Sequence, residues 1–185
     1  MLTFIVLLVI LGGLGLYLIS IYNGLVRGRN EVKSAWSSID VTLKRRYDLI
    51  PNLVETVKGY AAHERQTLEA VVKARQQAIS FTGGVEERAR IENTLTQSLR
   101  SLFALSEAYP NLKANQNFLA LQEELATTEN KIGFARQYYN DTAARYKNRI
   151  EMFPSNIIAN MFNFQLEPFF QLEAAGERVA LQVKF

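Results

Sequence analysis

The sequence predicts an all-α protein, with an N-terminal transmembrane helix followed by an elongated antiparallel helical bundle of three to four long helices. Residues 1–26 carry no charged side chain, whereas all 21 Lys and Arg lie from Arg27 onward. Beyond this point apolar residues recur every three or four positions, the spacing of one helical face. With 48% hydrophobic and 21% charged residues, the chain as a whole is not disordered. We expect an anchor at 1–26, the bundle at 27–153 and a phenylalanine-rich tail at 154–185.

The first helix is predicted to cross a membrane. At about 1.5 Å per residue, the uncharged run Leu2–Tyr22 covers a hydrocarbon core of about 30 Å. A cleaved signal peptide would begin with basic residues and hold an apolar stretch of only ~7–15 residues. The run has neither property, so we expect a retained anchor. Its expected anchor residues are Leu2, Phe4, Leu8, Leu14, Tyr17 and Tyr22.

The cations that follow the span predict its orientation. Arg27, Arg29 and Lys33 lie close enough to it to contact lipid headgroups, and only Met1 precedes it. By the positive-inside rule, the bundle lies in the cytoplasm and the N-terminus faces outward.

Apolar periodicity predicts three helical segments after the span. Glycines end the first segment and prolines end the other two, and Asn111 is expected to cap the third. Short connectors between long helices make neighbouring helices antiparallel. The expected segments are Val32–Ile79, Glu86–Tyr109 and Asn111–Phe153, with a short helical turn at Ile157–Phe162.

Pro51 lies inside the first segment, where it either opens a new helix or kinks a continuous one. The residue before a proline avoids helical dihedrals, which favours a break between Asp48 and Ile50. The apolar stripe stays in phase across the proline, which favours a kink. We expect the break.

Lys44, Arg45 and Arg46 form the densest charge cluster. One interpretation makes them contacts for a partner or for anionic lipid. The other makes them a solvated or ion-paired helix face. A continuous helix would put Arg45 about 35 Å from Tyr22, well beyond a Debye length, which favours the second interpretation.

Three polar residues beside the apolar stripes are candidates for a buried hydrogen-bonded network that sets helix register. Such a network specifies one packing arrangement when all its groups are satisfied. The alternative for Asn130 is an exposed position on a helix flank. The candidates are Asp40, Asn52 and Asn130.

The tail is rich in phenylalanine. Its rings either fold back and cap the end of the bundle or form an exposed patch for another subunit, a partner or the bilayer. The residues alone leave both interpretations open. The candidate contact residues are Phe162, Phe164, Phe169 and Phe170.

The residue inventory argues against an enzyme. The chain has no Cys, and His63-Glu64 lacks the second His, at position 67, that a zinc-protease helix requires. The glutamates do not form the Glu-x-x-His pattern of di-iron bundles, so we expect neither a metal site nor a cofactor. A net charge of +3 is small against the phosphate density of a duplex, so we expect no nucleic-acid partner.

Several segments of the chain together resemble the LemA family of bacterial membrane proteins. The longest is Leu43–Val54, which surrounds Pro51, and the resemblance runs from the anchor to about Phe170. It implies an anchored antiparallel bundle, usually of four helices, with no established enzymatic activity or cofactor. The other matching segments are Tyr22–Val26, Ala35-Trp36, Ile39–Val41, Val57–Ala61, Tyr109–Ala114, Leu121-Gln122, Thr128–Asn130 and Phe153–Asn156.

The leading hypothesis is a membrane-anchored, non-enzymatic scaffold or interaction module at the bacterial inner membrane. Its expected partners are the lipid bilayer, a second copy of the chain, and other membrane or cytoplasmic proteins. The resemblance and fold analogy suggest envelope upkeep or stress response as the process. A lipid-binding or membrane-shaping protein that acts through its basic residues and aromatic tail is the first alternative, and a hydrolase or metal enzyme is the second.

Overall fold

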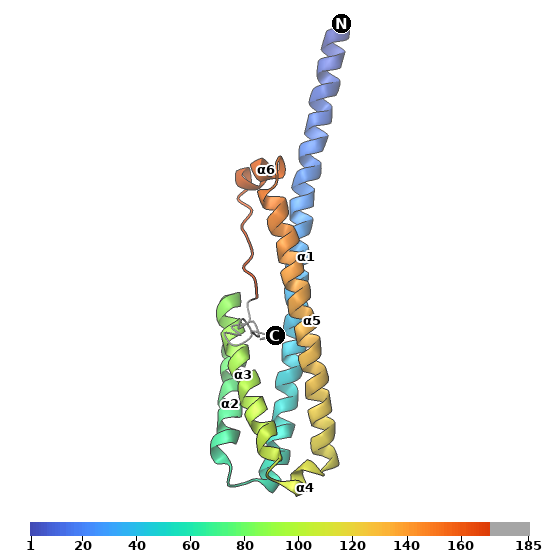
Figure 1. The fold of residues 1–185 in the computed structure, drawn as a ribbon. Coiled ribbons are helices and arrows are strands. Elements are labelled where there is room, and N and C mark those ends of the chain that lie inside the picture. Colours follow the sequence, from blue (N-terminus) through green and yellow to red (C-terminus); the bar gives the residue numbers. More distant parts are fainter. Residues whose placement is uncertain (171–185) are drawn as a thin grey trace, which may run out of the picture. The chain divides into compact units, whose positions relative to one another are not determined.

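The computed structural model describes residues 1–170, which fold into helices joined by short connections (Figure 1). No strand occurs among residues 1–170, so the all-α prediction is confirmed for this part of the chain. The rest of the predicted tail, from Gln171 onward, lies outside the described residues. The helices are α1 (Leu2–Tyr60), α2 (Arg65–Ser80), α3 (Val85–Ser106), α4 (Pro110–Lys113), α5 (Gln116–Glu151) and α6 (Ser155–Met161).

The chain divides into two compact units. Unit 1 comprises Met1–Asp40 and Phe134–Pro168, and unit 2 comprises Val41–Gly133 with Phe169 and Phe170. α1 and α5 each contribute residues to both units, and α6 belongs to unit 1. α1 passes the expected boundary between residues 26 and 27 without interruption.

In unit 1 the N-terminal part of α1 and the C-terminal part of α5 pack antiparallel. The rings of Trp36 and Tyr139 meet edge to face, with centroids 5.4 Å apart. Nearer the N-terminus, Gly28 faces Tyr146 so closely that a Cβ at residue 28 would lie 3.0 Å from the tyrosine ring. Glycine therefore permits the close approach of the two helices.

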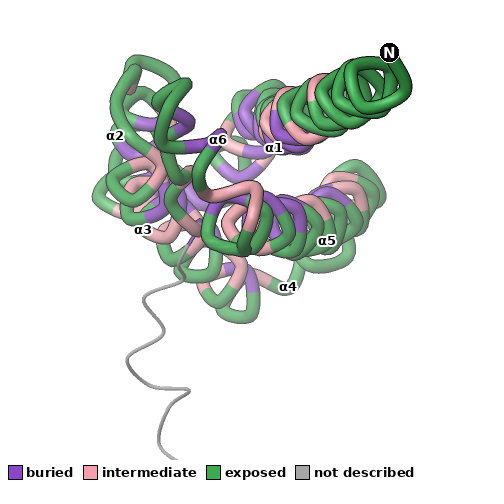
Figure 2. Tube along the Cα trace, turned by 90° about the horizontal axis from the view of Figure 1, so that it is seen from above, coloured by how far each residue is buried: buried purple, intermediate pink, exposed green. Residues whose placement is uncertain are grey.

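None of the described residues buries the first turns of α1. Residues 1–14 are all exposed (green at the N-terminal end of α1 in Figure 2), and none of the most apolar 18-residue stretch of α1 is buried. A core helix of a soluble protein would bury such a stretch. α1 is thus long and apolar enough to cross a membrane, and its apolar surface is free to contact lipid.

Unit 2 is built from four long helical segments, the C-terminal part of α1, α2, α3 and the N-terminal part of α5, together with the short α4. α2 and α3 lie side by side and antiparallel (Figure 1). Phe118 of α5 packs against Phe103 of α3, with ring centroids 6.2 Å apart. Apolar side chains from every segment form the core, among them Ile50, Leu53, Val57, Leu68, Val71, Leu95, Leu102, Phe118 and Leu125.

The expected break at Pro51 is wrong, because α1 continues through the proline to Tyr60. A proline has no N–H to donate to the carbonyl four residues earlier, which here belongs to Tyr47. Instead, Nε of Arg75 in α2 donates to the Tyr47 carbonyl oxygen at 2.7 Å. Burial of Ile50 and Leu53 on either side keeps the helix packed. A side chain from another helix thus replaces the lost backbone donor.

This replacement predicts coupling between Arg75 and Pro51. Arg75→Met leaves the Tyr47 carbonyl without a donor, so we expect it to lower the free energy of unfolding by about 1–3 kcal/mol. In a Pro51→Ala background the backbone N–H returns, and the same substitution is expected to cost clearly less. Urea unfolding of the four proteins of this double-mutant cycle measures the coupling. Equal costs in both backgrounds would contradict it, and Lys73→Met, at an exposed position of α2, serves as the control.

The predicted first segment does not run unbroken to Ile79. A turn at residues 61–64 separates α1 from α2, and the Tyr109 hydroxyl donates to Glu64 Oε1 at 3.0 Å beside it. The turn shifts the phase of the apolar stripe, so Val72 and Ile79 are exposed. The buried residues of α2 are Leu68, Val71, Ala74 and Ala78.

Asn111 is not the cap of the third long helix. It lies inside the short α4, which begins at Pro110, and α5 begins at Gln116. Asn115 takes the capping role, since its Oδ1 accepts a hydrogen bond from the Phe118 N–H at 3.0 Å. The Pro110 ring suits the first turn of a helix, which is why a separate helical turn forms before α5.

Candidate functional site

A cluster of charged side chains lies buried in the core of unit 2. We call it the Arg46 cluster, and it consists of Arg46, Tyr47, Glu92, Thr96 and Glu129. Arg46 lies on the same stripe of α1 as the buried Leu43 and Ile50, and Glu92 lies between the buried Ala89 and Leu95 of α3. The spacing that builds the apolar core therefore also carries two opposite charges into it.

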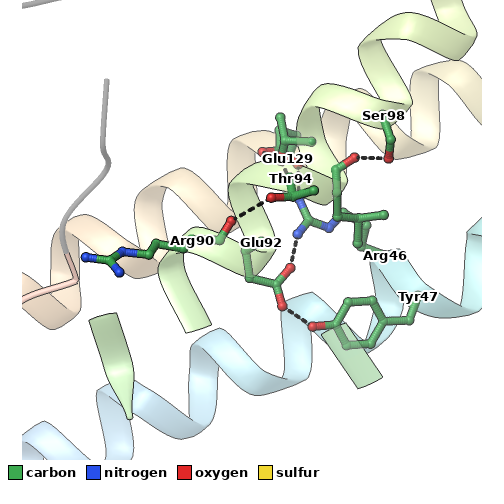
Figure 3. Close-up of polar contacts among 9 residues, drawn as sticks. Arg46, Tyr47, Arg90, Glu92, Thr94, Ser98 and Glu129 are labelled. Atoms are coloured by element: carbon green, nitrogen blue, oxygen red, sulfur yellow. Dashed lines mark hydrogen bonds and ion pairs between the residues drawn. The ribbon is translucent and has the colours of Figure 1, made fainter. Parts of the chain in front are cut away.

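The guanidinium of Arg46 connects three helices. Its Nη1 donates to Oε2 of Glu129 in α5 at 2.7 Å and to Oγ1 of Thr96 in α3 at 3.0 Å. Its Nη2 pairs with Oε2 of Glu92. The Tyr47 hydroxyl donates to the other oxygen of Glu92, so this carboxylate lies between the arginine and the tyrosine (Figure 3).

The ion pair between Arg46 and Glu92 is buried, so its contribution to stability depends on how completely its charges are paired. The side chains of Arg46 and Glu92 are fully buried, whereas that of Glu129 is 39% exposed. Taking two charges out of water costs several kcal/mol per ion, which only close pairing and further hydrogen bonds offset. Each carboxylate oxygen of Glu92 has a donor here. The cluster therefore holds α1, α3 and α5 in one relative register.

Tyr47 is held in its protonated form. Burial of the phenol raises its pKa well above the ordinary value, and the charge of Glu92 and the hydrogen bond to it raise the pKa further. The tyrosine thus remains a hydrogen-bond donor to Glu92 throughout the physiological range. A hollow of about 210 Å³ lies beside the cluster, lined by Arg46, Thr96 and Glu129 with Arg100, Gln122 and apolar side chains.

The interpretation of Arg46 as an exposed contact for lipid or a partner is wrong, because its side chain is fully buried. Lys44 and Arg45 are exposed. Lys44 pairs with Asp48 at 2.7 Å, one turn along α1, and Arg45 pairs with Glu124 of α5 at 2.6 Å. The three cations are adjacent in sequence, but the helix turns one of them inward and two outward.

The predicted polar network of Asp40, Asn52 and Asn130 is also wrong, since all three residues are exposed. They flank the apolar stripes of their helices and do not lie on them. The buried polar network is the Arg46 cluster, which sequence reasoning missed. A usable signal was present, because residue 46 falls three after Leu43 and four before Ile50 on the apolar stripe.

A second group of interactions lies in unit 1, where the candidate span of α1 ends. The Tyr22 ring packs edge to face against Phe162 and Phe164, with centroid distances of 4.8 and 5.7 Å. The Arg29 guanidinium lies 5.3 Å from the Phe164 ring centre, a cation–π distance. The segment after α6 is thereby fastened to α1.

The structure places the other candidates as follows. Phe164 and Phe170 are buried and Phe169 is half-buried, whereas Phe162 is exposed. The buried rings of Phe164 and Phe170 therefore fit a tail that folds back, whereas the exposed Phe162 fits a surface patch. Arg27 and Lys33 are exposed, and headgroup contact remains a prediction for them. Arg29 is half-buried against Phe164.

The surroundings of Tyr139 predict how the free energy of unfolding changes with pH in the alkaline range. Its hydroxyl donates to the Pro168 carbonyl at 2.8 Å, and burial, together with the charge of Glu167, raises its pKa to about 12. The unfolded tyrosine titrates near 10, so between pH 10 and 12 the unfolded state binds fewer protons, and stability falls as the pH rises. The expected slope from this group is about 1.4 kcal/mol per pH unit.

Tyr139→Phe tests this expectation. At neutral pH the variant loses one hydrogen bond, about 0.5–1.5 kcal/mol, but above pH 10 the difference from the parent protein should shrink and, before pH 12, change sign. Urea unfolding at a series of pH values measures the difference. A constant difference across the series would contradict the role of Tyr139.

The chain is similar to one family model and to several known proteins. A family model described as the LemA family matches residues 35–185. Protein LemA of Metamycoplasma hominis is 28% identical over 153 residues, which cover 80% of this chain and 68% of the relative. Magnetosome protein MamQ 2 of Paramagnetospirillum magneticum is 23% identical over 181 residues, and MamQ of Magnetospirillum gryphiswaldense is 22% identical over 181. Each of these two alignments covers 84% of this chain and 66% of the relative, so the chain spans about two thirds of the length of these relatives.

Proposed function

The chain belongs to the LemA family, and from this premise we propose that it is a membrane-anchored, non-enzymatic scaffold whose helical bundle binds protein partners. The observation that carries the proposal is the exposed apolar stretch of α1. The same helix that exposes this stretch continues into the packed core of unit 1, where Leu25, Val32 and Ile39 are buried. The proposed anchor and the first helix of the bundle are thus one continuous helix.

The proposal includes the side of the membrane. Arg27, which is exposed, follows the span within two turns, with Arg29 and Lys33 close behind, and such cations are retained on the cytoplasmic side. We place the bundle in the cytoplasm at the bacterial inner membrane, in envelope upkeep or stress response. The process rests on family resemblance and fold analogy.

Reporter fusions at Phe185 test the topology. A green fluorescent protein fused there should fluoresce, whereas alkaline phosphatase, which folds only outside the cytoplasm, should be inactive. Fusions at Met1 should behave in the opposite way. Active phosphatase at Phe185 would overturn the cytoplasmic placement.

Self-association is the partner interaction that the surface favours. Phe134 and Tyr138, one turn apart on α5 in unit 1, are 71% and 54% exposed. Large aromatic side chains are enriched at protein interfaces and contribute much of their binding energy. A pair of them on one helical face is a candidate contact for a second copy of the chain.

Substitution of both aromatic residues tests this contact. We expect Phe134→Ala/Tyr138→Ala to reduce cross-linked dimers severalfold in membranes without lowering the helix content. Leu119→Ala, at another exposed position of α5 (47% exposed), should leave the dimer yield unchanged. Equal yields from the parent protein and the double variant would remove the self-association surface.

A specific observation also favours the lipid-binding alternative. The exposed apolar residues around α6 are the kind of surface that enters a bilayer interface.

A further inference from the structure

Exposed apolar side chains gather on and around α6 in unit 1. Residues 152–166 contain no charged side chain, although much of the segment is exposed. Soluble proteins seldom expose a large contiguous apolar patch, and such patches mark sites of association. We call this surface the apolar foot, and it consists of Met152, Phe153, Ile157, Met161, Phe162 and Leu166, each at least half exposed.

The apolar foot is held against one particular turn of α1. Leu18, Ile19 and Tyr22 of α1 line a groove of about 350 Å³ together with Ile158, Met161 and Phe162. Phe162 and Phe164 both pack on the Tyr22 ring. Ile158 and Phe164 are buried, so they fix the segment while Met161 and Phe162 remain exposed.

The position of Leu18–Tyr22 along α1 determines how deep in the bilayer the apolar foot would lie. Leu2–Tyr22 spans about 30 Å as a helix, so Leu18–Tyr22 reaches one boundary of the hydrocarbon core. Tyr22 is an aromatic residue of the kind enriched at that boundary, and Arg27 follows within two turns. Figure 1 shows α6 beside α1 just below the free N-terminal stretch. If α1 crosses the bilayer as proposed, the foot is at the level where acyl chains meet headgroups.

We propose that the apolar foot inserts into the interface of the bilayer that α1 crosses, so that the protein has a second, monotopic lipid contact beside its span. The occupant is lipid because the groove is shared with span residues that themselves require an apolar surrounding. An interfacial segment of this kind buries its apolar face about 5–10 Å into the headgroup and acyl boundary. The inference rests on the proposed membrane anchoring.

Single-cysteine labelling of the full chain tests the foot, because the protein has no cysteine of its own. Separate variants carry an environment-sensitive fluorophore at Met161→Cys, Ile157→Cys, Leu8→Cys or Val72→Cys. Each is reconstituted into phosphatidylcholine and phosphatidylglycerol vesicles with lipids that carry a doxyl quencher near the headgroup end of the acyl chain. Val72, on α2, is the matched control, since its exposure of 49% is close to the 52% of Ile157.

The expected result is severalfold quenching and a blue-shifted emission at residues 157 and 161, but not at residue 72. At residue 8, in the middle of the span, a quencher placed deeper in the chain should act more strongly. Circular dichroism of each labelled protein confirms that the helices are retained.

The other outcomes overturn the proposal in distinguishable ways. Quenching at residue 8 without quenching at 157 and 161 leaves the anchor in place and removes the foot. A blue-shifted but unquenched label at residue 161 assigns the foot to a second copy of the chain. Quenching at residue 72 as well shows that the whole bundle lies on the lipid. Loss of quenching at residue 8 overturns the anchor, and the foot with it.

Discussion

Replacing Arg46 with methionine is expected to lower the free energy of unfolding by about 3–5 kcal/mol, because it leaves the charge of Glu92 buried without its cation. Both side chains are fully buried, and among residues 1–170 Glu92 then keeps only Tyr47 as a donor. Methionine fills much of the same volume, so lost packing contributes little. Urea unfolding in mild detergent, followed by circular dichroism, measures the loss.

Two further variants test whether the unpaired buried charge of Glu92 causes this loss of stability. Arg45→Met breaks an ion pair whose side chains are 57% and 41% exposed, so it should cost only about 0.2–1 kcal/mol. The triple variant Arg46→Met/Tyr47→Phe/Glu92→Leu removes every buried partner at once and should recover most of the stability. If Arg46→Met costs no more than Arg45→Met, the cluster does not stabilise the bundle as we infer.

Placing charges inside the span is expected to have the other large effect. Each arginine near the middle of a membrane helix costs about 2.5–3.5 kcal/mol, so Leu8→Arg/Leu11→Arg costs about 5–7 kcal/mol together. That is a change of about four powers of ten in the partition between membrane and water. The variant should leave the membrane band in a flotation gradient, where the parent protein remains.

The matched control places the same charges on the bundle. Val72 and Ile79 of α2 are exposed apolar residues, at 49% and 44%, so Val72→Arg/Ile79→Arg should float with the membrane as the parent protein does. If the span variant also floats after an alkaline wash, the apolar stretch of α1 is not what retains the protein.

Local patterns of the sequence were sufficient to predict which residues are mostly helical and where the candidate span lies, but not every helix boundary. The start of α3 beside Glu86 and the end of α5 before Pro154 follow from propensity and periodicity, which act within a few residues. The boundary between α1 and α2 was missed, because residues 61–64 contain no glycine or proline that would signal a turn. The turn there shifts the spacing of the apolar residues in α2. Asn115 caps α5 in place of Asn111, because Pro110 starts a separate helical turn before it.

The sequence by itself determined that this protein is helical and carries an uncharged apolar stretch long enough to cross a membrane, since composition and spacing are properties of neighbouring residues. Only the tertiary structure decided which charges are buried, whether α1 continues through Pro51, and where α6 lies. Arg46 meets a carboxylate 46 residues away, and the Tyr47 carbonyl meets an arginine 28 residues away. Whether a charge or a proline is tolerated depends on such distant partners, because the free energy of burial is set by what lies opposite each group.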